Sequence, residues 1–418
     1  MNWRFIIPLC MPLLSVAQEY PRKDVNLERL VDELFGFQDQ DLNYEDLYEN
    51  LALLLANPLN LNKATAEELR FVNILSEEQL QNLLSYRNEN GPFLSVYELQ
   101  AIPGIDLPTI YRIIPFVAVY DPATTLNASL WQRMLKEGNT YLIARFERTL
   151  ETRRGFTDAA TEPQRFLGDA NKIYMRFRSS RAGDYSIGFT VEKDAGEQVL
   201  WTPNQKQFGF DYNSFHAQVM NKGKIKNLIV GDYQAQFAQG LLLGSNFGFG
   251  KGAETITTIR RSNLGFLPYT SINETGYLRG TAVTYEASKN ILVSGFYSNT
   301  WRDATILSDT IEGVMASAFQ TTGLHRNIAE LNRRKTIQEQ QLGFILNYQN
   351  KKVDAGLIYH GLSYHLPVNR NSQPYNQFSF SGSILQNLGR FLNYTVNNFT
   401  FFSEAGKTIS GGVGLSAG

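Results

Sequence analysis

The chain has 418 residues, 39 lysines and arginines against 40 aspartates and glutamates, and one cysteine, Cys10. A single cysteine excludes an intramolecular disulfide and a cysteine-rich metal site. The net charge of −1 hides a division, because residues 18–120 hold 17 acidic side chains against 7 basic ones and residues 121–418 carry the compensating positive excess, which predicts two regions.

Residues 1–17 have the features of a cleavable secretory signal. Arg4 precedes a short apolar stretch, Phe5–Leu14, and Ser15-Val16-Ala17 supplies a small-x-small cleavage site. No small-residue lipobox precedes Cys10, so lipidation is not expected. No later apolar run approaches the roughly 20 residues that a transmembrane helix needs. We therefore expect an exported chain whose mature part begins at residue 18.

The next hundred residues are predicted to be helical. Residues 18–56 carry two apolar stripes with helical spacing, at Leu27, Leu30, Val31 and Leu34 and at Tyr44, Leu47, Tyr48 and Leu51. Residues 57–120 contain three capping boxes, formed by Thr65 with Glu68, Ser76 with Gln79, and Ser95 with Glu98. In each box the first side chain can cap a helix while the second reaches back to the cap amide. The spacing predicts short helices separated by tight turns.

Four stretches in this region resemble, in the same order, the helix-hairpin-helix module of bacterial competence DNA receptors. They are Leu59–Leu69 (LNLNKATAEEL), Tyr86–Phe93 (YRNENGPF), Ser95–Leu99 (SVYEL) and Ile102–Ile105 (IPGI), followed by Ile110, Ile113 and Ile114. The resemblance implies DNA binding through hairpins of the type Gly-Ile-Gly. The backbone amides of such a hairpin face a phosphate at a helix N-terminus.

The hairpins of this chain depart from that pattern. The first, Val72–Ser76, has no glycine and leads into Glu77 and Glu78, while the second keeps Gly104 but places Asp106 where the second glycine would stand. Duplex binding depends on cations that neutralise phosphates, and residues 57–120 offer four against seven acidic side chains. We therefore predict vestigial hairpins and a docking role instead. The predicted vestigial hairpin residues are Asn73, Ile74, Leu75, Pro103, Gly104, Ile105 and Asp106.

From Asp121 onward the apolar period changes to two, which predicts an antiparallel outer-membrane β-barrel over residues 121–418. Phe189 is expected to face lipid and Thr190 the lumen. Tight turns alternate with long connections, and Ser298–Lys335 is expected to be an extracellular loop. The predicted strands are Tyr141–Leu150, Lys172–Arg178, Tyr185–Glu192, Phe215–Asn221, Ile225–Tyr233, Gly280–Ala287, Ile291–Ser298, Glu339–Gln349, Val353–Leu362, Gln377–Ile384 and Leu392–Phe402.

Three further stretches look like an uncharacterised family of Bacteroidetes outer-membrane proteins that join a helix-hairpin-helix module to a barrel. They are Gly231–Gly244 (GDYQAQFAQGLLLG), Trp301–Ala304 (WRDA) and Thr322–Arg326 (TGLHR). The glycines of the first stretch predict a bend or an inward-folded segment. The chain ends without the terminal aromatic strand that is usual in such barrels, so a truncated barrel is expected.

The sequence offers little that points to catalysis. A pair of His216 with Asp232 is conceivable, but a barrel lumen is ordinarily rich in polar side chains. His360 and His365 lie five positions apart and would face opposite sides of a strand, which is poor metal-ligand geometry. His325 stands in a connection.

These observations together predict a non-enzymatic outer-membrane protein with a periplasmic helix-hairpin-helix docking domain, acting in envelope assembly or transport. No catalytic, cofactor-binding or metal-binding residue is predicted. The expected partners are outer-membrane lipid and periplasmic or outer-membrane proteins. Two alternatives stay open, namely DNA binding or uptake through the helix-hairpin-helix module, which its charge disfavours, and a barrel hydrolase.

Overall fold

The structure is a computed structural model. It describes residues 54–55, 58–72, 74–119, 132, 134, 139–181, 183–245, 260–271, 273–309, 313–350, 352–369, 374, 379–396 and 399–418. The predicted signal (residues 1–17), both predicted helix stripes of residues 18–56 and Asn73 of the first hairpin lie outside the described residues. No described helix is both long enough and apolar enough to cross a membrane.

The helix-hairpin-helix region comprises short helices closed by two very short parallel strands. Its elements are β1 (Leu59–Asn60), α3 (Ala66–Phe71), α4 (Glu77–Asn90), the 3₁₀ helix η1 (Val96–Ala101), α5 (Leu107–Ile113), η2 (Ile114–Phe116) and β2 (Val117–Ala118). All three predicted capping boxes are confirmed. The third opens a 3₁₀ helix, η1, rather than an α-helix. Local capping chemistry therefore determines where these helices begin.

Apolar side chains from every helix of this region meet in one core. Leu61, Leu69, Leu83, Phe93 and Leu99 have no exposed surface and belong to one cluster of buried side chains. Isolated helices of this length are only marginally stable in water. The shared core and the caps therefore stabilise these helices together.

The remainder of the described chain is dominated by an antiparallel sheet. Its strands, with the short pair β6–β7, are β3 (Asn139–Arg148), β4 (Asn171–Arg181), β5 (Tyr185–Lys193), β6 (Leu200–Thr202), β7 (Gln207–Gly209), β8 (Tyr212–Lys222), β9 (Ile225–Gln236), β10 (Gly265–Pro268), β11 (Leu278–Ser288), β12 (Ile291–Arg302), β13 (Ala304–Asp309), β14 (Gly313–Phe319), β15 (Ile337–Gln349), β16 (Val353–Val368), β17 (Gly382–Val396), β18 (Phe399–Thr408) and β19 (Val413–Ala417). Three 3₁₀ turns, η3 (Arg154–Phe156), η4 (Glu162–Gln164) and η5 (Pro203–Gln205), and the helix α9 (Ile328–Leu331) lie in its connections.

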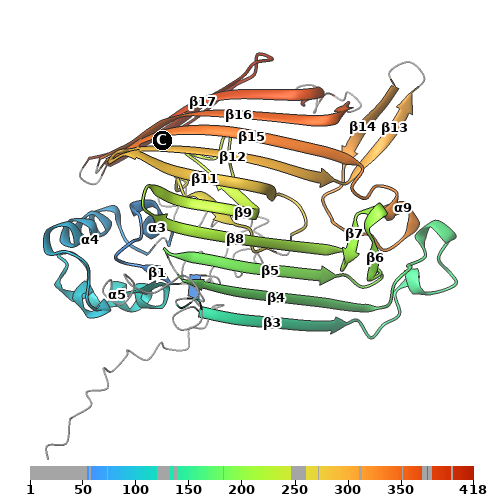
Figure 1. Ribbon diagram of the computed structural model, residues 1–418, viewed down its shortest axis with the longest axis horizontal. Helices are drawn as coiled ribbons and strands as arrows, with labels where there is room; N and C mark the ends of the chain where they lie inside the picture. The colour runs from blue at the N-terminus through green and yellow to red at the C-terminus, as the bar shows by residue number, and fades with distance from the viewer. Residues whose placement is uncertain are drawn as a thin grey trace, which may run out of the picture.

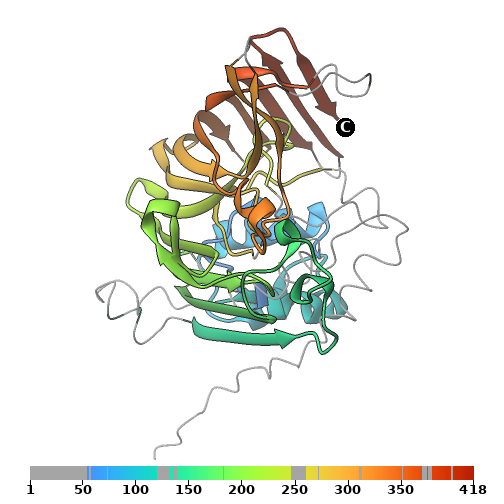
Figure 2. The same ribbon diagram turned by 90° about the vertical axis from the view of Figure 1, so that its right-hand side faces the viewer.

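The strands form a curved but open sheet in the order β19-β18-β17-β16-β15-β12-β11-β9-β8-β5-β4-β3. Figure 2 shows the curvature, with β3 and β19 at opposite edges. The expected small helical region followed by a large antiparallel sheet is thus confirmed, while closure into a barrel is not seen among the described strands. The edges are unpaired rows of backbone donors and acceptors.

The two ends of the sheet differ. At one end tight turns join β4 to β5, β8 to β9, β11 to β12 and β15 to β16; we call this the short-turn end. The helix-hairpin-helix region lies beside it (Figure 1). At the other end lie most of the longer connections, including those that carry β6, β7, β13, β14 and α9; we call this the loop end (Figure 1).

Two expectations about the sheet are wrong. Gln377–Ile384 and Leu392–Phe402 were expected as separate strands, but β17 runs through to Val396 and pairs back on β18 from Phe399. The strands reverse between Val396 and Phe399, where the sequence reads Asn-Asn, a residue type that favours turns. Ser298–Lys335 is not a plain loop, since it contains the end of β12, the β13–β14 hairpin and α9.

The predicted inward-folded segment is confirmed. Gly231 has a φ of +104°, and a Cβ there would come within 2.3 Å of the Phe215 carbonyl oxygen. After Gly231, β9 no longer pairs with β8, and Tyr233–Gln236 pair with β10 instead. Asp232 and Tyr233 still pair with β11. Residues 234–245 and 260–271, which we call the inward segment, leave the wall and fill the concave side of the sheet.

A buried carboxylate on a distant strand holds this segment. Glu404 of β18 has no exposed surface, and its oxygens accept backbone N–H bonds from Gln239 (2.8 Å), Leu241 (2.9 Å) and Leu242 (3.1 Å). The side chain of Leu242 packs over Gly389, where a Cβ would come within 2.3 Å of it. The inward segment therefore bridges the sheet from β9 to β18.

Candidate functional site

The predicted hairpin residues serve the fold of the helix-hairpin-helix region. Ile74 and Leu75 pack against its core, and Ile105 is buried in it. Gly104 has a φ of +79°, which favours glycine. Its carbonyl oxygen accepts a hydrogen bond from Gln79 Nε2 at 2.9 Å, and that of Pro103 accepts one from Asn82 Nδ2 at 2.9 Å. Asn73 lies outside the described residues.

The charges at the two hairpins are unfavourable to a phosphate. Asp106 caps α5 by accepting the Thr109 N–H at 3.0 Å, so a carboxylate occupies the helix N-terminus. Glu77 lies in the first turn of α4, 2.7 Å from Arg70. Burial by itself would raise the pKa of Glu77, but Arg70 outweighs this effect and lowers it. Both hairpins thus lead into negative charge.

Two of the four cations of this region are engaged within it. Arg70 pairs with Glu77, and Arg87 Nη1 donates to the carbonyl oxygens of Leu61 at 2.7 Å and Ala64 at 2.8 Å. Lys63 faces the sheet, because a Cβ at Gly183 would lie 3.1 Å from its Cδ. Few cations are therefore left for a nucleic acid.

The helix-hairpin-helix region and the short-turn end enclose a cavity of about 380 Å³. Leu59–Glu68 supply one side of it, and the turn residues Asn221 and Lys289 together with Phe266 of the inward segment supply others. The region that resembles a DNA-binding module is thus docked on this chain's own sheet, along the stretch that enters α3.

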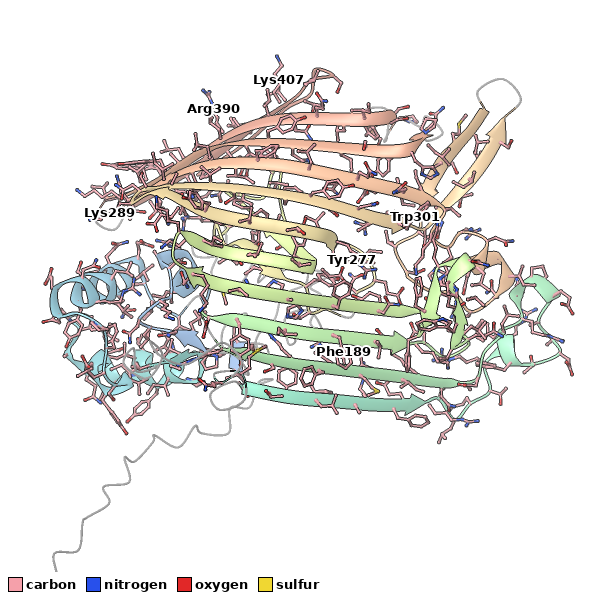
Figure 3. The ribbon with its side chains drawn as sticks, in the orientation of Figure 1. Phe189, Tyr277, Lys289, Trp301, Arg390 and Lys407 are labelled. Carbon is pink, nitrogen blue, oxygen red and sulfur yellow. The ribbon has the colours of Figure 1, made fainter. Side chains whose placement is uncertain are left out.

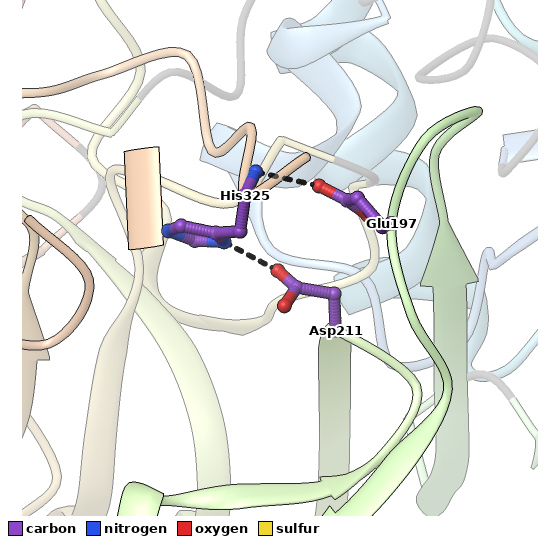
Figure 4. A group of neighbouring side chains, drawn as sticks. All are labelled: Glu197, Asp211 and His325. Carbon is purple, nitrogen blue, oxygen red and sulfur yellow. Dashed lines mark hydrogen bonds and ion pairs between the residues drawn. The ribbon is translucent and has the colours of Figure 1, made fainter. Parts of the chain in front are cut away.

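A second group of interacting side chains lies at the loop end. His325 is buried between two carboxylates, with Nδ1 2.5 Å from Asp211 and Nε2 2.7 Å from Asp303. Its backbone N–H donates to Glu197 at 2.8 Å (Figure 4). We call Glu197, Asp211, Asp303 and His325 the loop-end cluster. It joins four connections that are far apart in the sequence.

Burial and neighbouring charges shift the pKa values in this cluster. Burial, reinforced by the nearby Asp211, raises the pKa of Glu197 to about 7. Burial alone would lower the pKa of His325, but its hydrogen bonds to Asp211 and Asp303 outweigh this and raise it to about 9. Burial lowers the pKa of Lys335 beside the cluster to about 8. The cluster is therefore a group of strongly interacting titratable side chains away from bulk water.

The other histidines form no comparable group. His216 Nε2 lies 2.9 Å from Ser186 Oγ, whereas Asp232 pairs with Arg279 at 2.6 Å, so the conceivable His216–Asp232 pair does not form. His360 is buried and lies 2.9 Å from Gln341, while His365 is exposed, which fits the expectation that the two face opposite sides.

The sequence interpretation missed the loop-end cluster. Glu197 and Asp211 flank the β6–β7 pair, and no local spacing links them to His325, more than a hundred positions away. One signal was present, because Asp303 and His325 belong to the WRDA and TGLHR stretches, which the strand pattern does not explain. The fold brings these two stretches together.

The convex face of the sheet carries an unusual amount of exposed apolar surface. Phe189 is 44% exposed and Phe344 59%, whereas the adjacent inward side chains Thr190 and Ile345 are 4% and 1% exposed. Exposed large apolar side chains lie on eleven of the twelve strands of the main order: Leu142, Phe146, Phe189, Phe215, Val230, Val283, Tyr285, Val293, Tyr297, Leu342, Phe344, Leu346, Tyr348, Leu357, Leu388, Leu392, Phe399, Phe401, Val413 and Leu415. So large an apolar surface marks a contact face.

The rows of apolar residues run across strands. Leu142, Phe177, Phe189 and Phe215 are successive register partners on β3, β4, β5 and β8, and the rings of Phe177 and Phe189 stack at 5.6 Å. The face is interrupted near the last strands by two exposed cations, Arg390 on β17 and Lys407 on β18 (Figure 3). Their long apolar stems can lie along such a face while the charge reaches water.

Comparisons with known proteins identify the helical region. A family model described as "Helix-hairpin-helix motif" matches residues 56–118. The chain is also 37% identical over 78 residues to "Endonuclease/exonuclease/phosphatase family domain-containing protein 1" of Bos taurus. That similarity covers 18% of this chain and spans 14% of the length of the bovine protein. Residues 56–118 of the chain thus contain a helix-hairpin-helix motif, the kind of module that the sequence resemblance implied.

Proposed function

We propose that this chain is an outer-membrane protein whose convex sheet face contacts lipid and whose helix-hairpin-helix region is a periplasmic docking domain. The observation that carries the proposal is the alternation along the strands. Large apolar side chains are exposed on the convex face, while the concave face buries polar side chains together with the apolar core beneath the inward segment. A membrane barrel wall has this pattern, whereas a soluble sandwich would bury its apolar face.

The orientation follows from the two ends of the sheet. Outer-membrane barrels have short periplasmic turns and longer extracellular loops. The helix-hairpin-helix region lies at the short-turn end, which we therefore assign to the periplasm, and the loop end faces outward. Labelling of single cysteines from outside intact cells tests this orientation, since a residue in the loop-end connections should react and a residue in α4 should not.

The docking domain supports a non-enzymatic role in envelope assembly or transport. Its face at Leu59–Glu68 already contacts the sheet, and its surface also carries exposed Leu94 (83%), Leu107 (52%) and Tyr111 (57%). Inside the sheet, the Ser186–His216 and Asp232–Arg279 pairs are structural polar contacts. A hydrolase would need a nucleophile with a base and an orienting group.

Nucleic-acid binding is the second candidate, because the helix-hairpin-helix match and the bovine similarity both favour it. The charges of the hairpins weigh against it. A phosphate approaching α4 or α5 at its N-terminus would meet Glu77 and Glu78 or Asp106. Affinity for duplex DNA grows with each cationic contact through counterion release, and Arg70 and Arg87 are internally engaged.

A segment comprising residues 18–120 should accordingly show no salt-dependent binding to duplex DNA at physiological ionic strength. Fluorescence anisotropy of a labelled duplex, titrated with the segment at several salt concentrations, measures this. The matched control is Glu78→Lys, which replaces an exposed acidic side chain in the first turn of α4. We expect this variant to bind DNA weakly at low salt and not to bind at physiological salt. Binding of the unaltered segment at low micromolar concentration that falls steeply with salt would promote DNA uptake to first place.

A further inference from the structure

Two sequence stretches that the proposed function does not explain, WRDA (301–304) and TGLHR (322–326), meet at the loop-end cluster. We propose that Glu197, Asp211 and His325 bind a divalent transition-metal ion of the Zn²⁺ class there. One ligand atom from each of the three side chains lies within 4.8 Å of those of the other two. All three residues are buried. The inference does not depend on where in the cell the chain resides.

The hydrogen bonds around His325 leave one ring nitrogen for a metal. Nε2 lies 2.7 Å from Asp303, which can accept its N–H and fix the ring, as carboxylates commonly do for metal-ligating histidines. Nδ1 then faces Asp211 at 2.5 Å, a separation that a shared proton occupies in the metal-free protein. Because Zn²⁺ lies about 2.0–2.2 Å from each ligand atom, Nδ1 and the Asp211 oxygen must move apart to admit the ion, and the proton between them is released on binding.

The carboxylate of Glu197 is held in position before any metal binds. One of its oxygens accepts the backbone N–H of His325 and the other accepts that of Asp194, both at 2.8 Å. Its partner Asp211 is fixed by Arg334 at 3.2 Å through the oxygen that does not face His325. Because Glu197 and Asp211 are already ordered by these neighbours, they lose little conformational freedom when a metal binds.

A fourth carboxylate points to a ligand independently. Glu274 lines a cavity of about 50 Å³ together with Asp211, Asp303 and His325. It has no hydrogen bond or ion pair with any residue that the structure describes, although Asp211 and Glu197 are near enough to repel it. Gly323 makes room for it, since a Cβ there would lie 2.7 Å from the Glu274 carboxyl carbon. A desolvated carboxyl group without a partner takes up a proton unless a cation keeps it ionised.

The charges and the atoms of the site fit a divalent ion with mixed ligands. Glu197, Asp211, Asp303 and Glu274 are four carboxylates, and Arg334 and Lys335 are the two cations beside them. Arg279 and Arg302 line the same cavity, but each is paired with a carboxylate of its own, Asp232 and Glu339. With His325 neutral and all four carboxylates ionised, the difference leaves two negative charges for a divalent ion to balance. An imidazole nitrogen among carboxylates suits Zn²⁺ and its transition-metal neighbours, whereas Ca²⁺ and Mg²⁺ favour oxygen ligands alone.

The test is metal content of the full chain purified in detergent, stripped with EDTA and dialysed against Zn²⁺, with bound zinc measured by plasma mass spectrometry. We expect one Zn²⁺ per chain, less than a tenth of that in His325→Gln and in Asp211→Asn, and an unchanged value in the control His365→Gln, an exposed histidine outside the cluster. Co²⁺ should give visible absorption bands with the unaltered chain and none with His325→Gln.

Glu274→Gln keeps the test decisive if the other variants fail to fold, because Glu274 has no described partner to lose. This variant should weaken Zn²⁺ binding by about tenfold or more, the usual effect of changing a residue that supports a metal site. Stoichiometric zinc that is unaffected in Glu274→Gln and His325→Gln, or no zinc in the unaltered chain, would overturn the proposal.

Discussion

Replacing Phe189 by arginine is expected to block assembly of the chain into the outer membrane. Phe189 is 44% exposed on the convex face and lies in the aromatic row with Phe177 and Phe215. A charged side chain at a lipid-facing midplane position costs roughly 2–4 kcal/mol. The amount of protein recovered in outer-membrane fractions, relative to total expression, should therefore fall by at least several-fold.

The matched control is an inward position that can accept the same charge. Thr190 is unsuitable despite its adjacency, because it is only 4% exposed and its surroundings are filled. Thr284 of β11 instead faces the cavity of about 380 Å³ at the short-turn end. Thr284→Arg should assemble nearly as well as the unaltered chain. Equal losses from Phe189→Arg and Thr284→Arg would show that the convex face does not contact lipid.

Replacing Glu404 by alanine should release the inward segment. The change removes three charge-assisted hydrogen bonds to backbone amides from a carboxylate with no exposed surface. Each such bond contributes about 1.5–3 kcal/mol, and donors left unsatisfied in the interior add to the cost. Bonds that share one carboxylate are not additive, so local opening of the segment should become easier by on the order of 3–5 kcal/mol rather than by the full sum.

Hydrogen exchange measured by mass spectrometry on peptides covering residues 237–245 reports this opening. Exchange should accelerate by two orders of magnitude or more in Glu404→Ala, since about 1.4 kcal/mol corresponds to a factor of ten. Glu404→Gln, which keeps one carbonyl oxygen, should fall between. Lys407→Ala, on the exposed side of the same strand, should change nothing. Unaltered exchange in Glu404→Ala would mean that other contacts hold the segment.

The sequence predicted best what local chemistry decides. The capping pairs at Thr65, Ser76 and Ser95 each satisfy donors within one turn, so their positions in the sequence suffice to find them. The alternation that sets Phe189 outward and Thr190 inward is likewise a property of neighbouring residues. Gly231 indicated the bend into the inward segment, because glycine adopts a positive φ without strain.

What the sequence could not predict depends on distant partners. The boundary between β17 and β18 is set by pairing across a turn, and the continuous apolar alternation on both sides of it hides the reversal. Nothing in the sequence distinguishes Glu404 from the other acidic residues of the chain, which number 40 in all, because its contact with Gln239 forms only in the fold. The loop-end cluster similarly needs four connections to converge on His325. Closure of the sheet depends on whether its two edge strands, β3 and β19, pair, and the pattern within a single strand does not predict that.

Cysteine labelling from outside intact cells tests the proposed location and orientation most directly. Cys10 is the chain's single cysteine, so Cys10→Ser gives a background without thiols. Glu151→Cys then places one thiol in an exposed loop-end connection, and Asn88→Cys places one on the exposed surface of α4. A membrane-impermeant maleimide should modify the first in intact cells and the second only after the outer membrane is permeabilised. Modification of the α4 cysteine in intact cells, or protection of the loop-end cysteine, would contradict an outer-membrane protein with a periplasmic docking domain.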